Sequence, residues 1–384
     1  MTVYFDNAAT TPVHPQVFER MKPFYTEYYG NASSIHSFGR KARVAVENAR
    51  EIVAEFINAN PSEIYFTSGG TEANNFSLIG IAKAEKIASK RNHILTSSAE
   101  HHSVLDTCDE LQKSGFDLTK ANVDADTQIN PDTFNILTNE FTSLVSIIHT
   151  NNETGTVNPI ENISQIVKSK GIFFHTDAVQ CFGKMTINVQ ELGIDSLSGS
   201  AHKINGPKGT GFSFVKSGTP ITPLLIGGSQ ERNRRGGTEN VAGIVGFAEA
   251  VKIAKGKIKE AESYVRNIKE KFLSGLLSID NNGLKINGGI NVSPYILSVT
   301  FKPDYYRNDS EAMMMFLDLN GVAASNGAAC TSGTLKPSHV ILSAGGSVED
   351  ANGTIRFSFG MQNSETEVEY ALEVIQKMAI KFRR

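Results

Sequence analysis

A turn rich in glycine follows the first clear strand and has the composition of an anion-binding site. Residues 67–75 run from a strand through Gly69 and Gly70 into a helix start. Glycines let the backbone approach a ligand closely, and the first amides of a helix attract negative charge. An ordinary tight turn between strand and helix would look the same, so this segment alone leaves both interpretations open.

An acidic residue closes a second strand. Asp177 ends the apolar segment 172–176. Ligands of open α/β sheets bind at the carboxyl ends of the strands, where a carboxylate can pair with a protonated ring nitrogen. Taken in isolation, the more ordinary explanation, a helix-capping aspartate, is favoured.

Two lysines, Lys203 and Lys208, lie in a Ser/His/Gly/Pro-rich segment just after another strand. Most lysines are solvated surface residues. A carbonyl cofactor, however, needs a lysine that sheds its proton and forms a Schiff base. The spacing leaves both lysines as candidates.

Adjacent histidines, His101 and His102, follow a further strand end. No third ligand stands at helical spacing and no H-E-x-x-H or C-x-x-C motif occurs, so we expect no metal ion. A flat imidazole can instead stack on an aromatic ring or move protons near neutral pH.

The three cysteines differ in their surroundings. Cys330 stands among small residues in a predicted loop, where a thiolate would be reactive, although most free cysteines are buried and inert. Cys108 falls within a helical pattern and Cys181 lies near Asp177, and we interpret both as structural. So few cysteines argue against a disulfide framework and for a reducing compartment.

Alternating helices and strands must position these residues. Apolar residues at a 4-3-4-3 spacing predict an amphipathic helix over 38–57, followed by a strand at 63–67 and a helix from residue 71. Apolar strands are predicted at 93–97, 143–149, 172–176 and 209–215, and helices at 101–114 and 159–169. Such an alternation predicts an α/β fold with a mostly parallel sheet covered on both faces.

The pattern changes toward the C-terminus. A long Lys/Glu-rich helix is predicted over 248–278, then a strand at 295–301, a helix at 310–319, a strand at 354–359 and a terminal helix with a Ser364/Glu367 capping box. We expect a large α/β domain of residues 14–258. Residues 1–13 and 259–384 would form a smaller α+β domain that carries the Cys330 loop.

The bulk properties narrow the class of protein. A chain of 384 residues with 40% apolar and 20% charged residues fits a two-domain globular protein, and a net charge of -3 gives no reason to expect nucleic acid or a membrane surface. The N-terminus lacks the basic start and apolar core of a signal peptide, and no apolar stretch is long enough to span a bilayer. The expected location is the cytoplasm.

Ten segments, in the same order, resemble the cysteine desulfurases, a branch of the class V aminotransferase-like, fold-type-I pyridoxal-phosphate enzymes. They are residues 6–11, 30–36, 67–75, 100–105, 151–155, 175–180, 200–209, 236–240, the Cys330 loop and 355–358. The loop reads Ser-Asn-Gly-Ala-Ala-Cys where the family usually has Ser-Ser-Gly-Ser-Ala-Cys. These replacements are small, so we expect the chemistry to survive.

The resemblance implies a role for each candidate. Lys203, directly after Ser-x-His, would form the Schiff base with pyridoxal 5′-phosphate, and Lys208 would belong to the following turn. Asp177 would pair with the ring nitrogen, while His101 would stack on the ring. The other cofactor contacts expected are Gly70, Thr71, Asn152, Gln180, Ser200, His202 and Thr238.

The resemblance also implies an assembly and a reaction. Thr238 would reach the cofactor of a second subunit, which implies a homodimer, and Asn152 and Arg356 would hold the carboxylate of the substrate. The activity would be removal of sulfur from L-cysteine, giving L-alanine and a persulfide on Cys330, with His101 assisting proton transfers. An acceptor protein of unknown identity would take the sulfur. A selenocysteine lyase, or a sulfur-carrier subunit without cofactor, remain alternatives on the same fold.

Overall fold

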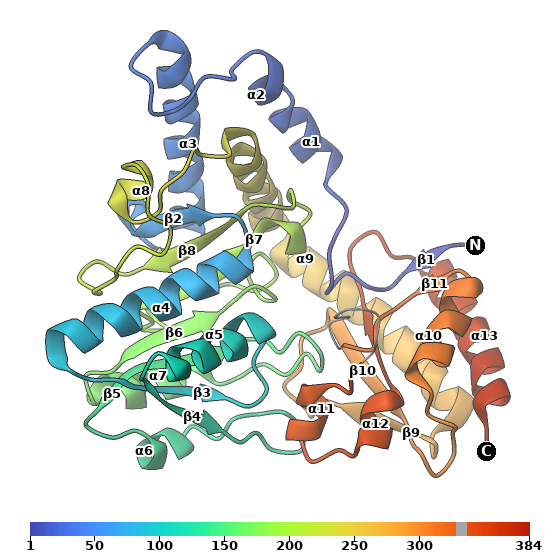
Figure 1. Cartoon of the computed structure of the whole chain (residues 1–384). Helices are drawn as coiled ribbons and strands as arrows, with labels where there is room; N and C mark the ends of the chain where they lie inside the picture. The colour runs from blue at the N-terminus through green and yellow to red at the C-terminus, as the bar shows by residue number, and fades with distance from the viewer. Residues whose placement is uncertain (328–335) are drawn as a thin grey trace.

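A seven-stranded sheet, in the order β2-β8-β7-β6-β5-β3-β4, forms the centre of the larger part of the molecule (Figure 1). The computed structural model describes residues 1–327 and 336–384. The strands are β2 (Ile64–Thr67), β3 (His93–Ser97), β4 (Asp117–Ala121), β5 (Thr142–Ile148), β6 (Phe173–Asp177), β7 (Ser196–Ser200) and β8 (Gly211–Val215). From β7 to β4 the neighbours pair parallel, while β8 is antiparallel to both β7 and β2. The predicted mostly parallel sheet is confirmed.

Helices cover both faces of this sheet, as a sheet that is apolar on both sides requires. On one face α4 (Gly70–Ser89) and α5 (His102–Lys113) bury residues such as Phe76 and Leu111. On the other face lie α3 (Ser37–Phe56), α7 (Ile160–Ser169) and the first part of α9 (Val241–Asp280). The remaining helices of this part are α1 (Pro15–Met21), α2 (Pro23–Thr26), α6 (Thr133–Leu137) and α8 (Gln230–Asn233), with 3-10 turns at Pro61–Glu63 and Ala201–Lys203.

The smaller part is built on an antiparallel sheet in the order β12-β10-β9. Its elements are β9 (Leu284–Asn287), β10 (Ile296–Phe301), α10 (Ser310–Leu319), α11 (His339–Ser343), α12 (Val348–Asn352), β12 (Thr354–Ser358) and α13 (Glu365–Phe382). The N-terminal strand β1 (Val3–Tyr4) pairs parallel with β11 (Val322–Ala323). The capping box of α13 is confirmed, because the backbone N–H of Ser364 donates to Glu367 Oε2 at 2.8 Å and that of Glu367 donates to Ser364 Oγ at 3.3 Å.

Helix α9 runs from one part into the other (Figure 1). It starts at Val241, earlier than the predicted 248, and Phe247 and Val251 belong to the core of the larger part. Farther along, Phe272 and Leu276 pack in a second apolar core together with Phe5. The molecule therefore has two separate cores, and the division into residues 14–258 and residues 1–13 with 259–384 stays a prediction. No helix within the described residues has both the length and the apolar character to span a membrane.

Candidate active site

A cavity of about 390 Å³ lies where β5, β6 and β7 end, and it gathers most of the predicted site residues. Parallel strands end at one edge of the sheet, so residues far apart in the sequence meet there. The predicted residues that line the cavity are Gly70, Thr71, His101, Asn152, Asp177, Gln180, His202, Lys203 and Arg356.

Two predicted residues that the structure describes, Ser200 and Thr238, do not line this cavity. Ser200 ends β7 and is buried, with no hydrogen-bond partner for its Oγ among the described residues. A Cβ built on Gly69 would lie 4.0 Å from that oxygen, so Ser200 lies directly behind the glycine turn. Thr238 lines a separate cavity of about 110 Å³. Cys330 lies outside the described residues.

A hydrogen-bonded chain fixes the carboxylate and the imidazole. Asn74 Nδ2 donates to Asp177 Oδ2 at 2.7 Å and to Ser103 Oγ at 2.8 Å, and the backbone N–H of Val179 donates to Asp177 Oδ1 at 3.0 Å. The backbone N–H of Ser103 donates to His101 Nδ1 at 3.1 Å, so the neutral ring carries its proton on Nε2. Burial lowers the pKa of His101, with the charge of Asp177 acting in the opposite direction. No residue pattern singles out Asn74, although it lies within the 67–75 segment.

Lys203 presents its amine inside the cavity, whereas Lys208 is exposed. The Nζ of Lys203 donates to the carbonyl oxygens of Ala8 and Ala9, and its distance to the Ala9 oxygen is 2.9 Å. Burial, with repulsion from Arg356 and Lys184, lowers the pKa of Lys203 to about 7. A substantial share of this amine is therefore neutral near pH 7, which is the nucleophilic form.

This lowered pKa predicts a pH dependence. In the protein without cofactor, we expect the rate of covalent capture of an aldehyde by Lys203 to rise with pH up to about 7 and then to level off. The reason is that only the neutral amine attacks, and it is fully formed above the pKa. The rate can be followed by the absorbance of added pyridoxal 5′-phosphate. A rate that continues to rise toward pH 10.5, the value of an ordinary lysine, would contradict the expectation.

The phosphate-side candidates stand close to the start of α4. Gly70 and Thr71 begin this helix, and a Cβ on Gly70 would lie 2.6 Å from Val179 Cγ2, so only glycine fits. His202 Nδ1 lies 3.1 Å from Thr10 Oγ1. Burial, with repulsion from Lys203, lowers the pKa of His202 to about 4. Its ring is therefore neutral at pH 7.

Arg356, on β12, brings a guanidinium from the smaller part of the molecule. Its Nη1 donates to the Asn152 carbonyl oxygen at 2.8 Å and its Nη2 to Asp6 Oδ1 at 3.0 Å. Arg356 Nε, Asn152 Oδ1 and Gln180 Oε1 are buried and have no hydrogen-bond partner among the described residues. Unpaired buried polar groups are costly, so these atoms, all on cavity-lining residues, are candidates to bond a ligand.

One wall of the cavity comes from residues that the sequence did not single out. Ser338 Oγ donates to Glu153 Oε2, and burial raises the pKa of Glu153. His339 Nε2 lies 2.8 Å from the carbonyl oxygen of Glu100, and its ring centroid is 4.7 Å from that of His102. These contacts hold the start of α11 beside the cavity. Glu153 lay within a recognised segment, but nothing in the sequence pointed to His339.

The two cysteines that the structure describes are buried. Burial raises the pKa of Cys108 to about 12, and it raises the pKa of Cys181 as well. Both thiols are therefore protonated at neutral pH and poor nucleophiles. Within residues 1–327 and 336–384, no three His, Cys, Asp or Glu side chains gather in a way that could hold a metal ion.

Comparison with known proteins identifies the family. The model of the family "Aminotransferase class-V" matches residues 3–371. Cysteine desulfurase IscS of Dictyoglomus turgidum is 43% identical over 385 residues, which cover 99% of this chain and 95% of the relative. A solved structure named NIFS-like protein superposes with a TM-score of 0.91 at 38% identity over 100% of both chains. SspA in complex with cysteine superposes with a TM-score of 0.81 at 35% identity, over 94% of this chain and 99% of SspA. The chain belongs to the class-V aminotransferase family, and its relatives there are cysteine desulfurases.

Proposed function

We propose that this protein is a pyridoxal-phosphate-dependent cysteine desulfurase that converts L-cysteine to L-alanine and leaves the sulfur as a persulfide on Cys330. The main support is that one cavity of about 390 Å³ is lined by the Lys203 amine, the Asp177 carboxylate and the Arg356 guanidinium. The pKa of the Lys203 amine is lowered to about 7. This combination suits an amino-acid substrate and a carbonyl cofactor with a ring nitrogen.

The residues around the cavity fit pyridoxal 5′-phosphate. The start of α4 at Gly70 and Thr71 offers backbone amides and a positive dipole end to the phosphate. The Oγ of Ser200, which has no hydrogen-bond partner among the described residues, lies near the same turn, and the neutral ring of His202 lines the same cavity. Gln180 lines the same cavity, and its side-chain amide would contact the ring oxygen. When bound, this cofactor withdraws electrons from the α-carbon of an amino acid joined to it.

The chain's own groups would then have distinct tasks. Asp177, held by Asn74 and Val179, keeps a carboxylate beside the ring nitrogen and so favours its protonated form. Lys203 would hold the cofactor covalently, and its Nζ would remove the α-proton and return it later. His101 would stack on the ring and could offer a proton at Nε2, because its Nδ1 already accepts from the Ser103 N–H.

Substrate orientation would come from Arg356 and Asn152. The Nε of Arg356 is buried without a partner among the described residues, and the Nδ2 amide of Asn152, which also lines the cavity, would donate to the same carboxylate. A guanidinium forms two parallel hydrogen bonds with a carboxylate, which fixes the amino acid in one orientation. The α-carbon is thereby held toward Lys203.

The sulfur step is balanced without an added oxidant. The Cys330 thiolate attacks the substrate sulfur, a sulfur–sulfur bond forms, and the carbon–sulfur bond breaks. The electron pair stays on carbon, which takes a proton to become the methyl group of alanine. The persulfide then passes its sulfur to an acceptor protein. The acting form would be a homodimer in which Thr238 of each copy contacts the other's cofactor.

The substrate assignment predicts matched yields. With L-cysteine, we expect alanine and enzyme-bound or released sulfur in equal amounts, measured by amino-acid analysis and sulfide detection. The equality follows because each carbon–sulfur cleavage produces one of each. Selenocysteine lyase is the competing assignment, and a large preference for selenocysteine that persists in Cys330→Ala would favour it. A protein that gains no yellow absorbance with pyridoxal 5′-phosphate would instead indicate a carrier subunit.

A further inference from the structure

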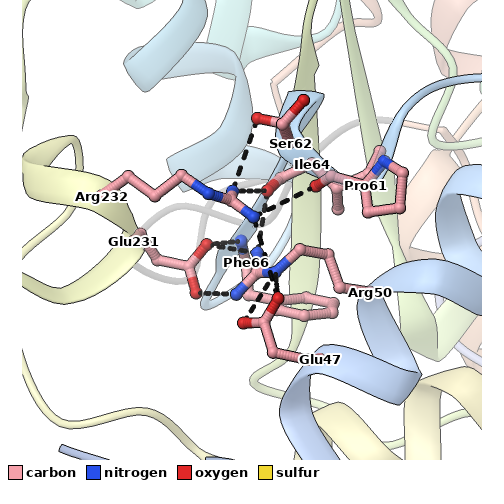
Figure 2. Close-up of polar contacts among 8 residues, drawn as sticks. All are labelled: Glu47, Arg50, Pro61, Ser62, Ile64, Phe66, Glu231 and Arg232. Atoms are coloured by element: carbon pink, nitrogen blue, oxygen red, sulfur yellow. Dashed lines mark hydrogen bonds and ion pairs between the residues drawn. The ribbon is translucent and has the colours of Figure 1, made fainter.

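Strand β2 is the outer strand at one edge of the central sheet, and it leads directly into the glycine turn at the cavity. Backbone groups on the unpaired side of an edge strand need other partners. Side chains provide them here. The Ile64 carbonyl oxygen accepts from Arg50 Nη1 at 2.8 Å, and the Phe66 N–H donates to Glu231 Oε2 at 3.0 Å (Figure 2).

Arg50 and Glu231 form a two-point ion pair between α3 and α8. Arg50 Nη1 lies 2.7 Å from Glu231 Oε2, and Arg50 Nη2 lies 2.9 Å from Glu231 Oε1. The two side chains are only 4% and 3% exposed. The guanidinium carbon lies 4.9 Å from the centroid of the Phe66 ring. Buried charges persist only where geometry and hydrogen bonding are nearly complete, as they are in this pair.

The backbone of the Glu231 segment is held in an unusual conformation. Glu231, Arg232 and Asn233 have φ angles of 44°, 57° and 62°, in the left-handed region that side-chain-bearing residues rarely adopt. Arg232 reaches the carbonyl oxygens of Pro61, Ser62 and Ile64 at 3.3–3.4 Å (Figure 2). Consecutive residues remain in such a conformation only where surrounding contacts enforce it.

A second ion pair ties the same segment to the far side of the turn. Glu72 Oε2 accepts from the Ser68 N–H at 2.8 Å, and Glu72 Oε1 lies 2.8 Å from Arg235 Nε. Thr238 follows shortly after Arg235. It lines the cavity of about 110 Å³ together with Ser68, Glu231 and Arg235. The glycine turn and the 229–240 segment are therefore joined on both sides.

We propose that Arg50 and Glu231 are positioning residues for the cofactor's phosphate, because they hold the 67–71 turn and the 229–240 segment in one fixed arrangement. The idea rests on the proposed function, in which Thr71 and the Thr238 of a second copy contact that phosphate. Neither Arg50 nor Glu231 lines the cavity of about 390 Å³, so both act through the turn and the segment. The affinity for the cofactor's phosphate would thus depend on the Arg50–Glu231 ion pair, which does not line the cavity of about 390 Å³.

The test compares ligands with and without the phosphate. In full-length Glu231→Gln freed of cofactor, we expect the Kd for pyridoxal 5′-phosphate to rise at least about tenfold, while the Kd for pyridoxal changes less than about twofold. The amide keeps the shape but removes the charge that holds Arg50 and the Phe66 N–H. Hydrogen exchange should become faster in peptides covering 64–71 and 229–240, and not in the rest of the larger part.

Glu47→Gln is the matched control. Glu47 contacts the same guanidinium at 3.2 Å but is 49% exposed, so its loss should leave both affinities unchanged. If Glu231→Gln does not fold, Arg235→Gln, which breaks the second pair, should give the same selective loss. Equal weakening of both ligands, or no weakening in a folded variant, overturns the inference. An unmodified protein that binds no pyridoxal 5′-phosphate would overturn the proposed function as well.

Discussion

Lys203→Ala is expected to lower the rate of desulfuration at least about 10³-fold and to abolish covalent attachment of the cofactor. The alanine variant removes the amine that, among the described residues, lines the cavity together with Asp177 and Arg356 and has its pKa lowered to about 7. Borohydride reduction followed by peptide mapping measures the attachment directly. In the unmodified protein, the reduced cofactor should be found on the peptide that contains Lys203.

Two other lysines make this test demanding. Lys208→Ala is the matched control, because Lys208 lies in the same segment but is exposed, and we expect full activity. Lys184 is the stricter competitor. It is buried, burial lowers its pKa to about 8, and it lines an adjoining cavity of about 160 Å³ that Lys203 also reaches. A reduced label on Lys184 or Lys208 would contradict the assignment.

The sequence predicted the apolar strands well because those strands are buried along their whole length. All residues of β5 are buried, so its composition is continuously apolar apart from small hydroxyl residues. Strand β7 is equally buried but reads Ser-Leu-Ser-Gly-Ser. Its hydroxyls are satisfied by side chains of other elements: Ser196 Oγ lies 2.8 Å from Ser77 Oγ, and Ser198 Oγ lies 3.0 Å from His175 Nε2. Such partners lie far away in the sequence, so the apolar pattern alone does not give the bounds of β7, although a strand was expected before Lys203.

The direction of strand β8 could not be predicted from the apolar pattern either. The apolar run at 209–215 was grouped with the parallel strands, and that grouping was wrong, because β8 is antiparallel to β7. The chain between the two strands holds only a short 3-10 turn around Lys203. A parallel connection needs a crossover of roughly a dozen residues or more, so this short link turns the chain back. The same short link places Lys203 just beyond the carboxyl end of β7, beside the cavity.

The candidate site was predictable where a residue follows its own strand. Asp177 and Lys203 stand at strand ends, and an open α/β sheet brings such ends together. Contacts between elements that are distant in the sequence produce no local residue pattern and could not be predicted. Ser338 with Glu153, His339 with Glu100, and Arg50 with Glu231 are each set by tertiary packing. The N-terminal Ala8 and Ala9 likewise reach the Lys203 amine only because β1 joins the smaller part.

Cys330→Ala is expected to lower persulfide and alanine formation from L-cysteine at least about 10³-fold. The absorbance of the bound cofactor should stay unchanged. The reason is that the proposed sulfur step needs a thiolate, and the other two cysteines cannot replace it. Cys108 and Cys181 are buried and their pKa values are raised, so their thiols stay protonated and out of reach. Mass spectrometry of the protein after incubation with L-cysteine measures the gain of one sulfur atom.

Cys181→Ala separates the nucleophile from a buried cysteine that directly follows the cavity-lining Gln180. Cys181 contacts the Ala178 carbonyl oxygen through its Sγ and lies close to Asp177 in sequence, so its loss tests proximity without changing Cys330. We expect this variant to form the persulfide at a rate within about threefold of the unmodified protein, because removing an inert buried thiol costs packing and not chemistry. Sulfide release that is unchanged in Cys330→Ala, or a persulfide located on Cys181, would mean that sulfur leaves the substrate by another route. Unchanged sulfide release in Cys330→Ala would favour the lyase assignment, whereas a persulfide on Cys181 would leave a desulfurase with a different nucleophile.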